Sequence, residues 1–310
     1  MLTYIGAMIE TASAPSKPND RRALIALLTG AALIALAPIF VRLSETGPTA
    51  TGFWRLALAS PILFAWRAVR TDPVQQRRLS KADLGLLVLA GAMFAGDLAA
   101  WHTSIALTSV ANATLLANAA PIFVAAGAWI WLDERPTAGF LGGLVLAIVG
   151  GALLARSSAD SSAHLAGDAL GLLTAVFYAG YMLAVKILRA RLSTSAIMAG
   201  SSIMGAAVLL PLALGFGERM LPSTFYGWVV LLGLAALSQV CGQGLIAWAI
   251  GHLTARFSAL GLLTQTAVAA LLAWMLFGET FTILQSTGII LVALGLFVAR
   301  IADKPSPPLA

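Results

Sequence analysis

The stretch from Gly96 to Val124 reads GDLAAWHTSIALTSVANATLLANAAPIFV. It consists of two long apolar segments, and Thr108-Ser109 is the only turn-like break between them. Several polar groups and a proline lie inside these segments: Asp97, His102, Asn112, Asn118 and Pro121. Ionisable side chains inside a bilayer are costly and are therefore rarely present without a task. We interpret the stretch as a helical hairpin in a membrane, whose polar side chains either line a pathway or hold helices together.

The composition of the whole chain agrees with a membrane environment. Of 310 residues, 59% are hydrophobic and only 10% charged, whereas about 25% charged residues are usual in soluble domains. The mean hydropathy is +0.90. The net charge of +6 could suggest nucleic acid, but the basic residues lie between apolar segments, as topology signals do. We therefore expect membrane lipid and a small-molecule substrate as partners, no nucleic acid, and a monomer or homodimer.

Ten apolar segments are long enough to cross a hydrocarbon core of about 30 Å, which takes roughly 17–25 helical residues. They span residues 23–43, 50–70, 83–105, 110–132, 138–156, 167–188, 194–215, 225–250, 256–277 and 281–301. Only helices satisfy the backbone groups of such segments in lipid. The sequence thus predicts an all-α integral membrane protein with ten transmembrane helices, flanked by cytosolic tails at 1–22 and 302–310.

Basic residues orient this bundle. They gather in the loops between the second and third segments and between the sixth and seventh: Arg67, Arg70, Arg77, Arg78, Lys81, Lys186, Arg189 and Arg191. Loops rich in lysine and arginine stay in the cytoplasm. With these loops inside, both termini are predicted to be cytoplasmic, and Arg42, Arg55, Arg156 and Arg219 fall on the opposite side.

The chain also repeats itself. Residues 109–137 read SVANATLLANAAPIFVAAGAWIWLDERPT, and residues 254–282 read TARFSALGLLTQTAVAALLAWMLFGETFT. An ungapped shift of 145 places Trp129 on Trp274 and Glu134 on Glu279.

This shift divides the chain into halves at 23–156 and 157–301, with five segments each. Five is odd, so the two copies enter the membrane in opposite directions. Such an inverted repeat is the architecture in which a midplane substrate site is exposed to each side alternately.

Four motifs carry a resemblance to a known family: FWRLALASP at 53–61, ALTSVANATLLANAAPIFVA at 106–125, and the acidic helix ends WLDERPT and MLFGETFT. Their order and spacing over residues 23–301 resemble the EamA-type branch of the drug/metabolite transporter superfamily. The resemblance implies secondary export of metabolites or drugs from a central cavity in the bacterial inner membrane, without ATP or another cofactor. The best-known ten-helix bacterial members of that family are amino-acid exporters, and the layout of this chain is compatible with that type. One departure is Thr266, which stands where the family often has a proline matching Pro121.

Polar and aromatic residues at matching depth in the two halves are the candidate site. The predicted substrate-binding residues are Asp97, Trp101, His102, Asn118, Tyr178, Tyr181, Gln239, Gln243, Trp248 and Gln265, and the predicted kinks or gates are Pro38 and Pro121. Each has a purely structural alternative. Asp97 could bind an amine or a coupling proton, or bond to a neighbouring helix. His102 and Trp101 could instead be interfacial residues, and membrane amides are often simple helix contacts.

Further residues leave two interpretations open. Arg55 either extends its charge to the interface or clamps a substrate carboxylate. Glu134 and Glu279 lie at helix ends, where a repeated capping or pairing role is favoured over chemistry. The pairs Gly142-Gly143 and Gly150-Gly151 permit close packing, in a scaffold or a dimer.

The leading hypothesis is a secondary transporter that exports amino acids, aromatic ones included. Broad export of lipophilic cations is the alternative. An intramembrane enzyme is disfavoured, because the segments contain no HExxH motif, no second aspartate to pair with Asp97 and no nucleophile elbow. A channel fits less well, because inverted repeats with proline-broken helices favour alternating access. We expect no metal or catalytic residue.

Overall fold

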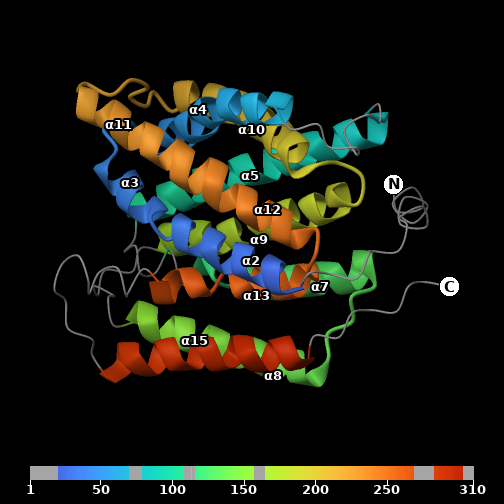
Figure 1. Cartoon of the computed structure of the whole chain (residues 1–310). Helices are drawn as coiled ribbons and strands as arrows, with labels where there is room; N and C mark the ends of the chain where they lie inside the picture. Colours follow the sequence, from blue (N-terminus) through green and yellow to red (C-terminus); the bar gives the residue numbers. More distant parts are fainter. Residues whose placement is uncertain are drawn as a thin grey trace.

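A computed structural model describes residues 20–69, 79–107, 113, 116–156, 165–268 and 283–302, and these residues form helices joined by short turns (Figure 1). The first half contains α2 (Asp20–Ile34), α3 (Ala37–Leu43), α4 (Pro48–Val69), α5 (Lys81–Leu107), α7 (Ala120–Leu132) and α8 (Ala138–Arg156). The second contains α9 (Leu165–Arg189), α10 (Thr194–Gly215), α11 (Phe225–Gly233), the π-helix η2 (Leu234–Gln243), α12 (Gly244–Ile250), α13 (Ala255–Gly261) and α15 (Ile283–Ala302).

Among the described residues, five helical stretches are long and apolar enough to cross a membrane by length and composition. They are Arg21–Leu43, Lys81–Leu107, Leu165–Arg189, Thr194–Gly215 and Phe225–Ile250. Each coincides with a segment predicted from the sequence, to within a few residues. The presence of ten transmembrane helices, the inverted repeat and the cytoplasmic location of both termini stay predictions. Asn112, Trp274 and Glu279 lie outside the described residues.

Prolines interrupt two of the predicted helices. α2 ends at Ile34 and α3 begins at Ala37, with Pro38 in the first turn of α3. Proline has no N–H and cannot donate to the carbonyl four residues earlier, which here is that of Ile34. Pro121 likewise lies in the first turn of α7, after a turn at Asn118 and Ala119. The structure therefore places both prolines at helix breaks, and their gating role stays a prediction.

Glycines decide how α8 packs. α8 and α15 lie side by side at one edge of the bundle, with α4, α10 and α11 at the opposite edge (Figure 1). A Cβ on Gly143 would meet the carbonyl oxygen of Gly295 at 2.5 Å, and one on Gly150 would meet that of Gly288 at 2.7 Å. Gly142 has open space instead. Within the pair of glycines at 142–143, the second therefore lets the two backbones touch.

Capping groups hold the end of the bundle where α10 begins. The Ser80 hydroxyl accepts from the Asp83 N–H, and an Asp83 carboxylate oxygen accepts from the Ser80 N–H, a reciprocal capping box that starts α5 at Lys81. This is two residues earlier than the predicted start at 83. Asp83 also pairs with Arg191 at 3.8 Å.

Glu134 joins the two halves at the same end. Its carboxylate accepts from the Ala255 N–H, at 3.0 and 3.2 Å to the two oxygens, and so caps the N-terminus of α13. The side chain is buried, and burial raises the pKa of Glu134. Arg135 does not bond to it but pairs with exposed Asp133. Of the two structural roles expected for Glu134, the structure shows the capping one.

At the opposite end of the bundle, two glutamates each cap the N-terminus of a helix in the other half. Glu218 follows α10 and accepts from the backbone N–H groups of Thr49 and Ala50 at the start of α4. Glu45 precedes α4 and accepts from the N–H groups of Ser223 and Thr224 at the start of α11. The hydrogen bond from the Thr224 hydroxyl lowers the pKa of Glu45. This reciprocal exchange ties the first half to the second.

The glycine packing of α8 predicts opposite effects for neighbouring substitutions. Gly143→Ala drives a methyl group into the α15 backbone and should destabilise the protein by about 1–3 kcal/mol, a typical cost of overpacking. Gly142→Ala meets open space and should be neutral or stabilising, because alanine is the better helix former by about 1 kcal/mol. Thermal unfolding in detergent compares the two variants. Equal melting temperatures would contradict the tight α8–α15 contact.

The Glu134 cap predicts a graded loss of stability. Glu134→Ala removes the acceptor for the α13 N-terminus and should cost about 1 kcal/mol, as lost caps typically do. Glu134→Gln keeps an acceptor oxygen and removes a charge that burial opposes, so its cost should be smaller. Because the folded pKa of Glu134 is raised, the stability of the parent protein should fall as pH rises from the unfolded value near 4.5 through that raised pKa. Glu134→Gln should lack this slope, and exposed Asp133→Asn is the control.

Candidate functional site

The buried guanidinium of Arg55 is the centre of the candidate site. Arg55 lies within α4 and is only 3% exposed. Its Nε donates a hydrogen bond of 3.0 Å to Oε1 of Gln239, and its guanidinium carbon lies 5.6 Å from the centre of the Phe94 ring. A cation over an aromatic face is attracted by the ring electrons. Of the two interpretations left open by the sequence, burial excludes extension of Arg55 to the interface.

Asp97 supplies the opposite charge. It lies on α5, one turn after Phe94, and is 8% exposed. Its electrostatic partner is Arg55, yet the charged atoms of the two are more than 4.0 Å apart, beyond an ion pair. Within the described part of the chain, no side chain or backbone group donates a hydrogen bond to this carboxylate. The two charges therefore face one another without direct contact.

Aromatic and amide side chains surround this pair. Tyr181 of α9 stacks on Phe94, with ring centres 4.5 Å apart. The Tyr178 ring lies 5.9 Å from that of Tyr181, and its hydroxyl accepts from Nε2 of Gln243 at 3.3 Å. Gln239 also donates to the Ser202 hydroxyl of α10 at 3.4 Å. The described contacts thus link four helices, α4, α5, α9 and η2, into one polar cluster with α10 beside it.

The two glutamines owe their placement to an unusual backbone. Gln239 and Gln243 are buried and lie in the π-helix η2. π-Helical stretches are rare and frequently occur at functional sites. The spacing of four residues predicts one shared face in an α-helix, and both side chains do point to the polar cluster. The π-helix itself has no signature in the sequence.

The remaining predicted residues make other contacts. Trp101 lies beside His102, with ring centres 5.5 Å apart, and His102 Nδ1 is 2.8 Å from the Pro48 carbonyl oxygen. The Trp248 ring, near the end of α12, lies with its centre 4.3 Å from that of the His252 ring, and the two rings are tilted by 36°. Asn118 donates to the Thr266 hydroxyl at 2.9 Å, a contact between the two halves. For Gln265, the described contact is a backbone hydrogen bond to Leu262.

The structure therefore gathers five of the ten predicted residues: Asp97, Tyr178, Tyr181, Gln239 and Gln243. Arg55 and Phe94 join them. A carboxylate clamp was one of the two interpretations left open for Arg55, but neither residue was among the ten predicted binding residues. An arginine inside an apolar segment was the available signal for Arg55. The only signal for Phe94 in the sequence was its position one turn before Asp97. Substrate binding by all of these residues stays a proposal.

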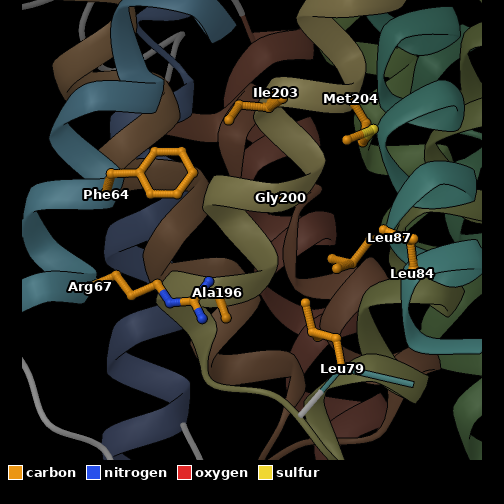
Figure 2. Close-up of a pocket in the computed structure, with 9 residues that line it drawn as sticks. All are labelled: Phe64, Arg67, Leu79, Leu84, Leu87, Ala196, Gly200, Ile203 and Met204. Carbon is orange, nitrogen blue, oxygen red and sulfur yellow. The ribbon is translucent and has the colours of Figure 1, made fainter. Parts of the chain in front are cut away.

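A separate apolar pocket lies on the flank of the bundle (Figure 2). It has a volume of about 170 Å³ and is lined by side chains of α4, α5 and α10, together with Leu79. Arg67 of α4 is the only charged residue among those described in the lining. Such a lining suits a hydrocarbon chain better than a polar metabolite, and none of the predicted site residues belongs to it.

A model of the EamA-like transporter family matches residues 21–156 and again residues 165–301. The chain belongs to the EamA-like transporter family. This confirms the family expected from the sequence motifs. With its apolar helices, the chain is a multi-pass membrane protein of the bacterial inner membrane.

Relatives of this EamA-like protein are transporters too. The pseudopaline exporter CntI of Pseudomonas aeruginosa is 29% identical over 215 residues, which cover 69% of this chain and 74% of the exporter. An uncharacterized transporter of Archaeoglobus fulgidus is 26% identical over 274 residues, or 88% of this chain and 94% of that one. A crystal structure with 17% identity superposes with a TM-score of 0.75 over 91% of this chain and 97% of its own, which supports the fold.

The hydrogen bond between Arg55 and Gln239 predicts unequal effects for the two glutamines. Gln239→Leu leaves a buried charged donor without its acceptor and should destabilise the protein by about 1–3 kcal/mol. Gln243→Leu breaks a longer bond between neutral groups and should cost about 1 kcal/mol or less. Thermal unfolding in the same detergent measures both. An equal or larger loss for Gln243→Leu would contradict the central role of Arg55.

Proposed function

We propose that this protein is a secondary active transporter that exports small metabolites, with amino acids as the substrate class, aromatic ones included. The observation that carries the proposal is the membrane-buried polar cluster around Arg55 and Asp97. Buried ionisable groups in membrane helices mark substrate or ion pathways. The cluster is formed by helices of both halves, where transporters built from repeats bind their substrates.

The packing of the helices supports alternating access between two inverted halves. The family model matches each half separately. In addition, helix contacts in one half have counterparts in the other. In this comparison α5 corresponds to η2 and α12, α2 corresponds to α9, and α4 corresponds to α10. The pair α5–α9 then corresponds to the packing of η2 and α12 on α2, and the pair α5–α10 corresponds to α4–η2. A pseudo-twofold axis would relate these contacts.

The chemistry of the cluster favours a zwitterion over the other candidates. Tyr178, Tyr181 and Phe94 offer aromatic surface, and the glutamines offer neutral hydrogen bonds. A phosphate ester or nucleotide sugar would require several basic groups, whereas Arg55 is the only basic side chain in the described cluster. The same guanidinium repels a lone lipophilic cation. Export of a small metabolite also agrees with the relative named as a pseudopaline exporter.

Flux into proteoliposomes tests this function. We expect the purified protein to take up radiolabelled phenylalanine and threonine along an imposed gradient, faster than protein-free liposomes do. Gln243→Leu should slow this flux severalfold, because it replaces a polar group of the cluster with an apolar one. Leu141→Ala, at an exposed position of α8, should not change the flux. The absence of flux for every amino acid tested would overturn the proposed substrate class.

A further inference from the structure

Arg55 and Asp97 keep hydrogen-bonding capacity that the protein does not use. A guanidinium has five N–H donors, and the hydrogen bond that Arg55 makes within the described chain comes from Nε. The two Asp97 oxygens accept none from the described residues. Some polar atoms elsewhere in the described chain are fully enclosed and have no hydrogen-bond partner, for example Thr174 Oγ1 and His102 Nε2. The unpaired atoms of Arg55 and Asp97 differ from these because they are not fully enclosed. Water can therefore reach the free ends of both side chains, although the two residues are only 3% and 8% exposed.

The gap between the two charges is built into the packing. Buried opposite charges normally gain most by direct contact, because each has lost its hydration. Here Gln239 holds the Arg55 guanidinium from the η2 side, and Phe94 lies against it at 5.6 Å. Phe94 is in turn stacked on Tyr181. These contacts keep Arg55 at its distance from Asp97, more than 4.0 Å away.

We propose that Arg55 binds the carboxylate of the substrate and Asp97 its ammonium group, so that the transporter selects molecules that carry both charges. The inference rests on the proposed function and deepens it to named specificity-determining residues. A guanidinium fork matches a carboxylate in two parallel hydrogen bonds. A zwitterion placed in the gap satisfies both buried charges and adds no net charge to the membrane interior. A substrate with one charge leaves the other side chain unpaired, which buried sites reject strongly.

A set of three ligands isolates each charge. Phenylalanine carries both charges, phenylalaninamide lacks the carboxylate, and 3-phenylpropionate lacks the ammonium group. Affinities are measured by calorimetry on the purified protein, and flux is measured in proteoliposomes. The parent protein should bind phenylalanine at least about tenfold more tightly than either analogue, a difference of about 1.4 kcal/mol.

Two variants should show a crossed pattern. Arg55→Gln should weaken phenylalanine binding about tenfold or more, and it should leave phenylalaninamide binding unchanged or tighter, because it removes a positive charge that repels this cation. Asp97→Asn should weaken phenylalanine binding similarly, and it should leave 3-phenylpropionate binding unchanged or tighter, because it removes a negative charge that repels this anion. A merely structural role would weaken all three ligands together. Arg42→Gln, at an exposed position of α3, is the matched control and should change none of the affinities.

The double variant Arg55→Gln/Asp97→Asn guards against misfolding, because it leaves no uncompensated buried charge. It should keep the parent melting behaviour and lose the preference for phenylalanine over both analogues. If the parent protein transports phenylalanine but binds both analogues equally well, the assignment to Arg55 and Asp97 is overturned and the proposed function stands. If no amino acid is transported or bound, the proposed function fails, and the assignment fails with it.

Discussion

The burial of the Arg55 guanidinium within an apolar bundle is the constraint on which the centre of this structure depends. A charge removed from water must be hydrogen bonded or opposed by another charge, or its cost is prohibitive. Gln239 supplies the hydrogen bond, Phe94 the aromatic face, and Asp97 the opposite charge. These three groups come from η2 and α5, so the position of α4 in the bundle is coupled to both helices. The π-helical backbone of η2 carries the glutamine that makes this possible.

Carboxylates have a different role at the two ends of the bundle. Glu134, Glu45 and Glu218 all accept hydrogen bonds from backbone N–H groups that open a helix of the other half. The first turn of a helix has unpaired N–H groups and a partial positive charge, which a carboxylate satisfies without a basic partner. The ends are thus closed by satisfied carboxylates. Asp97, which lies well inside the long helix α5, accepts no such bonds from the described residues, and this contrast separates structural acids from the candidate site.

Helices of the bundle pack through glycines at some contacts and through aromatic rings at others. Where α8 meets α15, glycines bring two backbones into contact, as is common where lipid offers no hydrophobic driving force. Between α5 and α9, aromatic rings pack against one another at Phe94, Tyr181 and Tyr178. Glycines also bring backbones together beside this cluster, where a Cβ on Gly91 of α5 would meet the Gly205 nitrogen of α10 at 2.9 Å.

The sequence by itself determined the class of the protein and most of its helices. Apolar length sets the spans, because lipid leaves the backbone no other way to satisfy its hydrogen bonds. α10 and α8 lie where the sequence predicted them, and Pro38 and Pro121 lie at breaks because proline lacks the N–H that a helix needs. The motifs and their order also identified the family. Asp97 and the two glutamines stood out for a similar reason, since polar groups in apolar segments are costly.

Only the tertiary structure decided which of these groups meet. Whether Arg55 turns inward or reaches the interface depends on an acceptor 184 residues away, Gln239, and no local pattern records that contact. The same holds for Glu134, whose capped helix begins 121 residues later in the other half. Asn118 and Thr266 likewise bond to each other across the halves. The cost of burying a polar group is local and visible in the sequence, but the partner that compensates it is chosen by packing.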